Sequence, residues 1–223
     1  RLLEMHDKAG VDRLIELLTG LEENDKRRIA IAETLLSPDI APPAKKIKKL
    51  YKSVKKKKKP ELNQKLLELW VASGSEKAFD KINKMFGATH FDKRLVAAKA
   101  FGHSDEKAAV QKLGKGLFEG NPKMRMAAAR SLRQLADPSS LSFLKRAISK
   151  ERNTDVKIAV VEALGAIGTK DAMRILRFNS RTRMPEIKKA IIEAVRTAGR
   201  KDGAKTLNLF FGARNTEIQW RAF

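Results

Sequence analysis

Apolar residues recur along this chain at helical spacing, in short segments that Gly, Pro, Asn or Asp interrupt about every 15 residues. The segment NTDVKIAVVEALGAIG from Asn153 is the clearest example. Its apolar positions include Val161, Leu164 and Ile167, and Gly168 follows them where a helix would end. The pattern predicts successive short helices, and the frequent Gly and Pro argue against one long coiled coil.

This segment belongs to a repeat of about 31 residues. Related segments are FDKRLVAAKAFG from Phe91, NPKMRMAAARSLRQL from Asn121 and MPEIKKAIIEAVRTAG from Met184. The basic residue after the first apolar one marks the register, at steps of 31, 32 and 31 residues: Arg94, Arg125, Lys157 and Lys188. One helix pair cannot bury its own apolar face, so the repeat predicts an all-α solenoid of stacked pairs.

The repeat resembles the HEAT-like repeat of the phycobilisome-lyase type, whose first helix reads roughly D-x-x-V-R-x-A-A-x-A-L-G-x-I-G. The matching residues are Asp155, Val156, Lys157, Ala159, Ala163, Leu164, Gly165, Ile167 and Gly168. The resemblance covers the chain from about residue 90 onward and is specific to the repeat class. It implies an α-solenoid (superhelix) of HEAT-like helix pairs, with the second helices lining one side.

We expect one continuous solenoid with an irregular beginning. Residues 1–60 are predicted to form divergent helical repeats with a Lys-rich helix end, and residues 61–223 to form regular 31-residue repeats. Because both ends resemble interior repeats, we expect a fragment of a longer protein, or ends that a partner caps.

Charge narrows the choice of partner. The chain has 48 Lys and Arg against 26 Asp and Glu, a net charge of +22, which attracts nucleic acid, anionic lipid or an acidic protein. Part of this charge is a run that we expect to act as an auxiliary basic arm: Lys55, Lys56, Lys57, Lys58 and Lys59. The alternative is a solvated helix end or tether.

Basic residues also recur at 31-residue steps on the predicted second helices. At about 100° per residue, three such positions lie within about 60° of one another, facing away from the core. We therefore predict a partner-binding surface made of Lys81, Lys84, Lys112, Lys115, Arg146, Arg174, Arg177, Arg181 and Lys205. The alternative is that exposed helix faces of a Lys-rich chain are charged in any case.

Aromatic residues give little sign of a base-stacking surface. Phe143 falls on the predicted basic face, whereas Phe178 follows Ala147 in register and is predicted to point inward. Trp70 and Trp220 fall at core positions. This distribution argues against a DNA glycosylase, which such basic repeat scaffolds can also form.

We find no pattern of residues typical of catalysis. There is no cysteine, and His6, His90 and His103 have no partner at metal-ligand spacing, so we expect no metal site and no cofactor. His, Ser and Asp are adjacent in FGHSDEK, which fits a capping turn better than a catalytic triad. Phosphate-binding loops and nucleophile elbows are absent.

The sequence therefore predicts a non-enzymatic scaffold or adaptor that binds an acidic protein segment or partner subunit through its basic second helices. The alternative is sequence-independent DNA or RNA binding through phosphates on the same surface. A membrane role for the apolar stripe of AKKIKKLYKSV is disfavoured, because neighbouring helices can cover that stripe. No small-molecule substrate is expected, and a cytoplasmic location is favoured.

Overall fold

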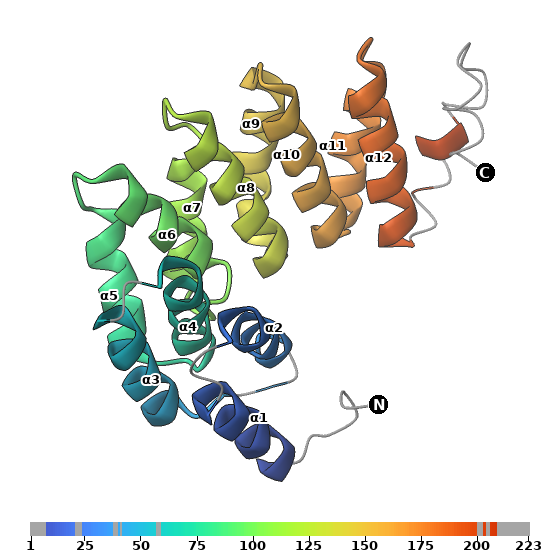
Figure 1. Cartoon of the computed structure of the whole chain (residues 1–223). Helices are drawn as coiled ribbons and strands as arrows, with labels where there is room; N and C mark the ends of the chain where they lie inside the picture. The colour runs from blue at the N-terminus through green and yellow to red at the C-terminus, as the bar shows by residue number, and fades with distance from the viewer. Residues whose placement is uncertain are drawn as a thin grey trace. The chain divides into compact units, whose positions relative to one another are not determined.

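The computed structural model describes residues 8–20, 24–37, 40, 42–56, 59–199, 203 and 206–208. These residues form helices and contain no strand, which confirms the all-α fold (Figure 1). The helices are α1 (Lys8–Gly20), α2 (Asp25–Leu35), α3 (Ala44–Lys56), α4 (Pro60–Ala72), α5 (Glu76–Phe86), α6 (Phe91–Phe101), α7 (Lys107–Gly116), α8 (Pro122–Leu135), the 3₁₀ helix η1 (Pro138–Ser140), α9 (Leu141–Lys150), α10 (Thr154–Ile167), α11 (Lys170–Asn179) and α12 (Pro185–Ala198).

The chain divides into two compact units, Arg1–Glu106 and Lys107–Phe223. The boundary falls between α6 and α7, which the sequence assigns to one repeat. The predicted division into residues 1–60 and 61–223 stays a prediction. Within the described residues, no helix is both long enough and apolar enough to span a bilayer.

The recurrent Asn of the repeat is an N-cap of the first helix. The side-chain oxygens of Asn24, Asn121 and Asn153 each accept a hydrogen bond from a backbone N–H in the first turn, at 2.9 to 3.1 Å. The cap satisfies a donor that the helix itself leaves unpaired. The period of the sequence is therefore written into the helix starts.

Two glycines end first helices as predicted. Gly168 after α10 and Gly199 after α12 have φ of 60° and 59°, a left-handed conformation that glycine adopts without strain. The predicted turn at Asp137 is also confirmed, because its carboxylate accepts a hydrogen bond from Ser139 N–H at 2.7 Å. Pro138 follows in the first position of η1, where a missing N–H is tolerated.

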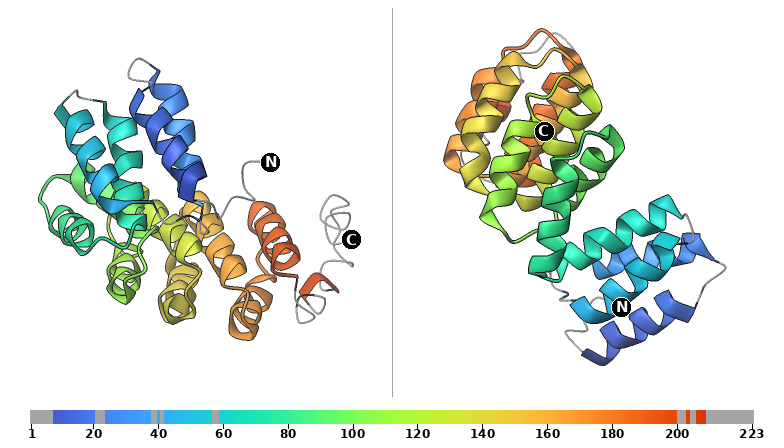
Figure 2. Two further views of the ribbon diagram at one scale, coloured as in Figure 1. Left: turned by 90° about the horizontal axis from the view of Figure 1, so that it is seen from below. Right: turned by 90° about the vertical axis from the view of Figure 1, so that its left-hand side faces the viewer.

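In the second unit the helices form two layers (Figure 2). The first helices α8, α10 and α12 pack against one another extensively, whereas the second helices α7, α9 and α11 touch one another less. The close packing depends on a small residue, because a Cβ at Gly165 of α10 would lie 2.7 Å from Ala194 Cβ of α12. This layer is the core of the unit, and its fully buried residues include Leu132, Val160, Leu164 and Ile191.

The first unit uses longer side chains. Trp70 of α4 is buried, as predicted, and its ring lies 5.6 Å from that of Tyr51 in α3. Phe101 of α6 meets Phe79 and Phe86 of α5 edge to face, at 5.7 and 5.5 Å. Arg28 is 2% exposed, and its Nε donates to the carbonyl oxygen of Leu18 at 2.9 Å, so a buried guanidinium joins α2 to the end of α1.

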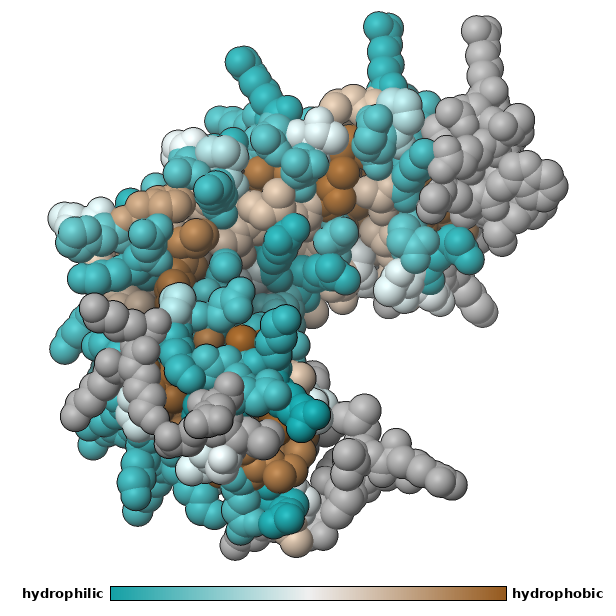
Figure 3. Space-filling view, viewed as in Figure 1, coloured by the Kyte–Doolittle hydropathy of each residue, from teal (hydrophilic) through white to brown (hydrophobic). Residues whose placement is uncertain are grey.

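The apolar residues of both units are largely internal. In the view of Figure 3, hydrophilic residues cover most of the described surface, and hydrophobic residues show in patches between them. The exposed large apolar residues among those described are Leu17, Phe118 and Phe178.

Replacing Gly165 by Ala is expected to destabilise the protein by about 1–3 kcal/mol, because the added methyl would meet the backbone and Cβ of Ala194 rather than a flexible side chain. Urea unfolding followed by circular dichroism measures this. Gly120→Ala is the control, since a Cβ there meets nothing within 4 Å and should change stability by less than about 0.5 kcal/mol. Equal stability of the two variants would contradict the close packing of α10 and α12.

Candidate partner-binding face

In the second unit, the second helices carry the basic residues that the sequence predicts to bind a partner. α7 and α9 each hold three basic residues and no acidic one, and α11 holds three basic residues and Asp171. α9 contacts both α7 and α11, so these residues lie on neighbouring helices. The predicted members described here are the half-buried Lys112 and the exposed Lys115, Arg146, Arg174, Arg177 and Arg181. We call them, together with Lys145 and Lys150, the basic face.

An arginine and an aromatic ring stack on this face. The guanidinium carbon of Arg146 lies 4.6 Å from the centre of the Phe118 ring, a distance that favours a cation–π interaction. Phe118 is 37% exposed. The ring holds the Arg146 side chain against the turn after α7, so the guanidinium is positioned rather than free to sample solvent.

The register of the repeat shifts at α11, and the prediction that Phe178 points inward is wrong. Buried Leu113 and Leu144 are 31 residues apart, but the next buried equivalent, Met173, follows Leu144 after only 29. The cause is the turn before each second helix. η1 precedes α9, whereas α11 begins directly after Gly168 and Thr169. Phe178 is consequently 83% exposed.

The same shift changes how basic residues correspond between helices. Lys115 and Arg146 take equivalent places on α7 and α9, but on α11 it is Arg174 that corresponds to Lys145. Arg174 also donates to Asp171 at 2.8 Å. Basic charge thus continues across α11, through positions that a constant 31-residue step does not give.

The sides of α9 and α11 enclose a groove of about 480 Å³. Its apolar lining includes Leu141, Ile175 and Phe178, and Lys145 and Arg174 stand on opposite sides of it. Phe143, which was predicted to lie on the basic face, is half-buried instead. A Cβ at Gly114 would lie 2.6 Å from its ring, so Phe143 packs closely on α7.

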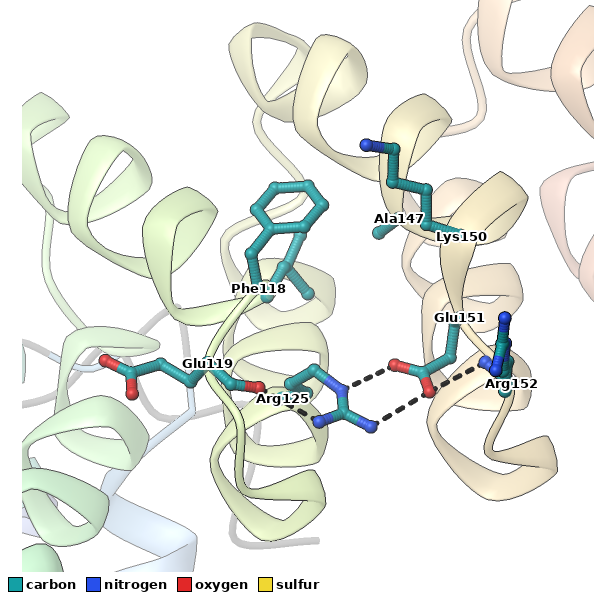
Figure 4. A pocket seen from close by; sticks show the side chains of 8 residues that line it. Phe118, Glu119, Arg125, Ala147, Lys150, Glu151 and Arg152 are labelled. Carbon is teal, nitrogen blue, oxygen red and sulfur yellow. Dashed lines mark hydrogen bonds and ion pairs between the residues drawn. The ribbon is translucent and has the colours of Figure 1, made fainter.

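An ion pair underlies the basic face and joins two turns (Figure 4). Arg125 at the start of α8 donates to both oxygens of Glu151, at 2.7 and 3.0 Å, and to the carbonyl oxygens of Glu119 and Gly120. Glu151 also accepts the backbone N–H groups of Arg152 and Asn153. In Figure 4, Phe118 and Lys150 extend to the same side of this pair. The pair therefore fixes the turns from which the basic face projects.

The remaining predicted residues lie elsewhere. Lys81 and Lys84 are on α5 of the first unit, where Lys81 is half-buried and Lys84 exposed. In the predicted arm, Lys55 is exposed on α3, and Lys59 is tied to Asp25 by an ion pair of 2.8 Å. Outside the described residues lie Lys57, Lys58, Lys205 and Trp220, together with the side chain of Lys56.

The described histidines form no metal centre. No group of three or more His, Cys, Asp and Glu able to hold a metal ion occurs in the part of the chain that the structure describes. His103 lies 3.8 Å from the buried Glu68, and burial lowers the pKa of His103 although that carboxylate opposes the effect. Ser104 accepts a hydrogen bond from Glu106 N–H at 3.2 Å, which agrees with a capping turn at FGHSDEK.

Sequence reasoning missed the support of the basic face. Arg125 marked the repeat register, but nothing in the sequence joins it to Glu151, 26 residues away. Phe118 and Lys145 were also missed. A pairing of each second helix with its own turn length, instead of one fixed step, would have placed Lys145 next to Arg174.

This arrangement defines an α-solenoid of helix pairs, a repeat scaffold of the kind suited to binding proteins. The chain belongs to the family of HEAT repeats, whose matches cover residues 82–165 and 113–196, over half of its length. No curated protein sequence matches the chain.

Solved structures are similar in fold. One is human deoxyhypusine hydroxylase in complex with glycerol, with 17% sequence identity, 89% of this chain and 76% of that chain covered, and a TM-score of 0.51. Another is the complex of CpcE and CpcF, the phycocyanin lyase of Nostoc sp. PCC7120, with 20% identity, coverage of 74% and 70%, and a TM-score of 0.51. Both are named as enzymes, so this fold alone does not decide whether a protein is catalytic.

Replacing Glu151 by Gln is expected to lower stability at pH 7 by about 1–3 kcal/mol, because Arg125 loses its charged acceptor. Burial raises the pKa of Glu151, but hydrogen bonds from Arg125 and Asn153 outweigh this and hold the pKa below its usual 4.5. The carboxylate therefore stabilises the fold above pH 4.5 and loses this effect as the pH falls below it. Urea unfolding should show a large difference from the unmodified protein at pH 7 and a small one at pH 3.

The exposed Glu193, 3.9 Å from Arg196, supplies the control, since Glu193→Gln should change stability by less than about 0.5 kcal/mol. A Glu151→Gln effect that does not shrink at low pH would count against the ion pair as its source.

Proposed function

We propose that this protein is a non-enzymatic adaptor that binds an acidic protein segment or partner subunit through the basic face. The observation that carries this proposal is the distribution of charge between the two layers of the second unit. α7, α9 and α11 together contain one acidic residue, Asp171, whereas α10 and α12 contain two each.

The acidic residues of the first-helix layer are partly neutralised within it. Glu162 of α10 pairs with Arg133 of α8 at 3.0 Å, and Glu193 lies 3.9 Å from Arg196 within α12. On the second helices of this unit, the one printed ion pair joins Arg174 to Asp171. Charge that the protein does not neutralise itself is available to a partner, and complementary charge raises both the rate and the specificity of association.

The groove between α9 and α11 supports a peptide-like partner. Its apolar floor lies between Lys145 and Arg174, and the exposed Phe178 stands at its side. A segment that alternates apolar and acidic side chains would match both features. Lys81, Lys84 and Lys205 remain proposed members of the same surface.

Nucleic-acid binding through phosphates is the second candidate, and the aromatic rings favour it. Phe118 lies under Arg146, and Phe178 is exposed on α11, which carries Arg174 and Arg177. Exposed rings among cations are the usual platform for unpaired bases.

Replacing Lys115, Arg146 and Arg177 together by Glu is expected to abolish binding of an acidic partner and to leave helicity unchanged, because all three side chains are exposed. A nuclease-treated pull-down identifies the partner, and fluorescence anisotropy with its acidic segment measures affinity. The matched control replaces the exposed Lys123, Arg130 and Arg196 of the first helices by Glu, with the same change in net charge. If the two triple variants bind equally well, the basic face is not the binding surface.

Titration with random-sequence DNA, duplex and single-stranded, across a salt series tests the second candidate. Contact between six to eight basic residues and phosphates would give a slope of log K against log salt of about −5 to −7 on duplex DNA. A slope near zero, or no binding at low salt, excludes the nucleic-acid reading. Binding that the triple variant on α7, α9 and α11 abolishes would favour it over the adaptor.

A further inference from the structure

The first unit contains a groove lined mainly by lysines. It measures about 730 Å³ and is bounded by α3, α4, α5, the turn after α5 and the start of α6. Asp80 is the one acidic residue among the described residues that line it. The basic ones, which we call the lysine groove, are Lys55, Lys77, Lys81, Lys84 and Lys93. Lys77 and Lys93 belong to no motif of the sequence, and their meeting with Lys55 depends on the packing of three helices.

The groove has a fixed aromatic wall. Tyr51 is 4% exposed, and Lys81 Nζ lies 5.6 Å from the centre of its ring. Burial lowers the pKa of Lys81, and the positive charge of Lys55 lowers it further. Ammonium groups gathered in a partly desolvated groove repel one another, so an anion placed among them removes an unfavourable interaction.

The residue type indicates which anion fits. All five cations that line the groove are lysines, and none is arginine. Arginine is the usual partner of planar, bidentate carboxylates, whereas lysine binds phosphate oxygens as a point charge. Five lysines opposed by one aspartate match a ligand with about four negative charges, and the volume lies within the range of small-molecule sites.

Asn63 adds a requirement of its own. It lines the groove, and its side chain hydrogen-bonds to Tyr51. Its Oδ1 is buried and has no hydrogen-bond donor in the described structure. A buried acceptor without a donor is unfavourable, so a ligand that carries a hydroxyl group gains a hydrogen bond here that a bare phosphate chain cannot make.

We infer that the lysine groove binds a small organic polyphosphate, with at least two phosphate groups on a hydroxyl-bearing scaffold. The ligand is held rather than converted, which accords with the expectation that the chain has no small-molecule substrate. The inference uses residues of the first unit alone, and it does not depend on the basic face of the second unit. It assigns Lys81 and Lys84 to this ligand in preference to the partner.

Isothermal titration calorimetry of the full chain at physiological salt, with fructose 1,6-bisphosphate and inorganic tripolyphosphate as probes, tests this. Replacing Lys77 and Lys93 by Ala should lower affinity for both probes at least roughly tenfold, because each exposed lysine supplies a charged hydrogen bond. The control replaces Lys26 and Lys45 by Ala, two exposed lysines of the same unit that do not line the groove, and should change affinity less than about threefold.

Equal losses in the two double variants, or no binding by the unmodified protein, would overturn the inference, since the first outcome means that net charge alone attracts the probes. Asn63→Ala should weaken fructose 1,6-bisphosphate binding and spare tripolyphosphate, and an equal effect on both would refute the hydroxyl requirement. Thermal unfolding confirms that each variant is folded. Partner binding by the Lys77 and Lys93 variant should be unchanged, so a failure here is distinct from a failure of the adaptor proposal.

Discussion

The stacking of first helices is the interaction on which the second unit depends. α8, α10 and α12 approach so closely that Gly165 has no room for a side chain beside Ala194. Small residues in this layer bring long apolar side chains from successive repeats into one continuous core, which a single helix pair cannot form. The N-cap asparagines and the left-handed glycines then fix where each first helix begins and ends.

The second helices contribute less to that core and more to the surface. They contact one another weakly, and their outer sides carry the basic face. What orders this face lies beneath it, in the Arg125–Glu151 ion pair and in the Phe118 ring under Arg146. The first unit has a different solution, in which aromatic packing around Trp70 and Phe101 forms the core and lysines gather in a groove above Tyr51.

The fold could be predicted from the sequence because its signals are local. The asparagine caps, Gly168, Gly199 and the turn at Asp137 each act within a few residues, and the period between them defines the repeat. The site could be predicted only in part. The exposure of Lys115 and Arg146 follows from helical spacing, but Phe178 was misplaced because η1 lengthens one turn and not the next. The lysine groove escaped prediction, since Lys55, Lys77 and Lys93 come from helices whose mutual packing no local pattern encodes.

The unequal packing of the two layers bears on how such a protein can change over evolutionary time. A substitution at Gly165 or Ala194 disturbs the neighbouring repeat, so few alternatives are acceptable there. A substitution at Arg177 or Phe178 alters only what meets the solvent. Binding preference can therefore drift one helix at a time while the architecture is inherited intact, and exchanging second-helix surface residues is the natural route to redirecting this scaffold by engineering.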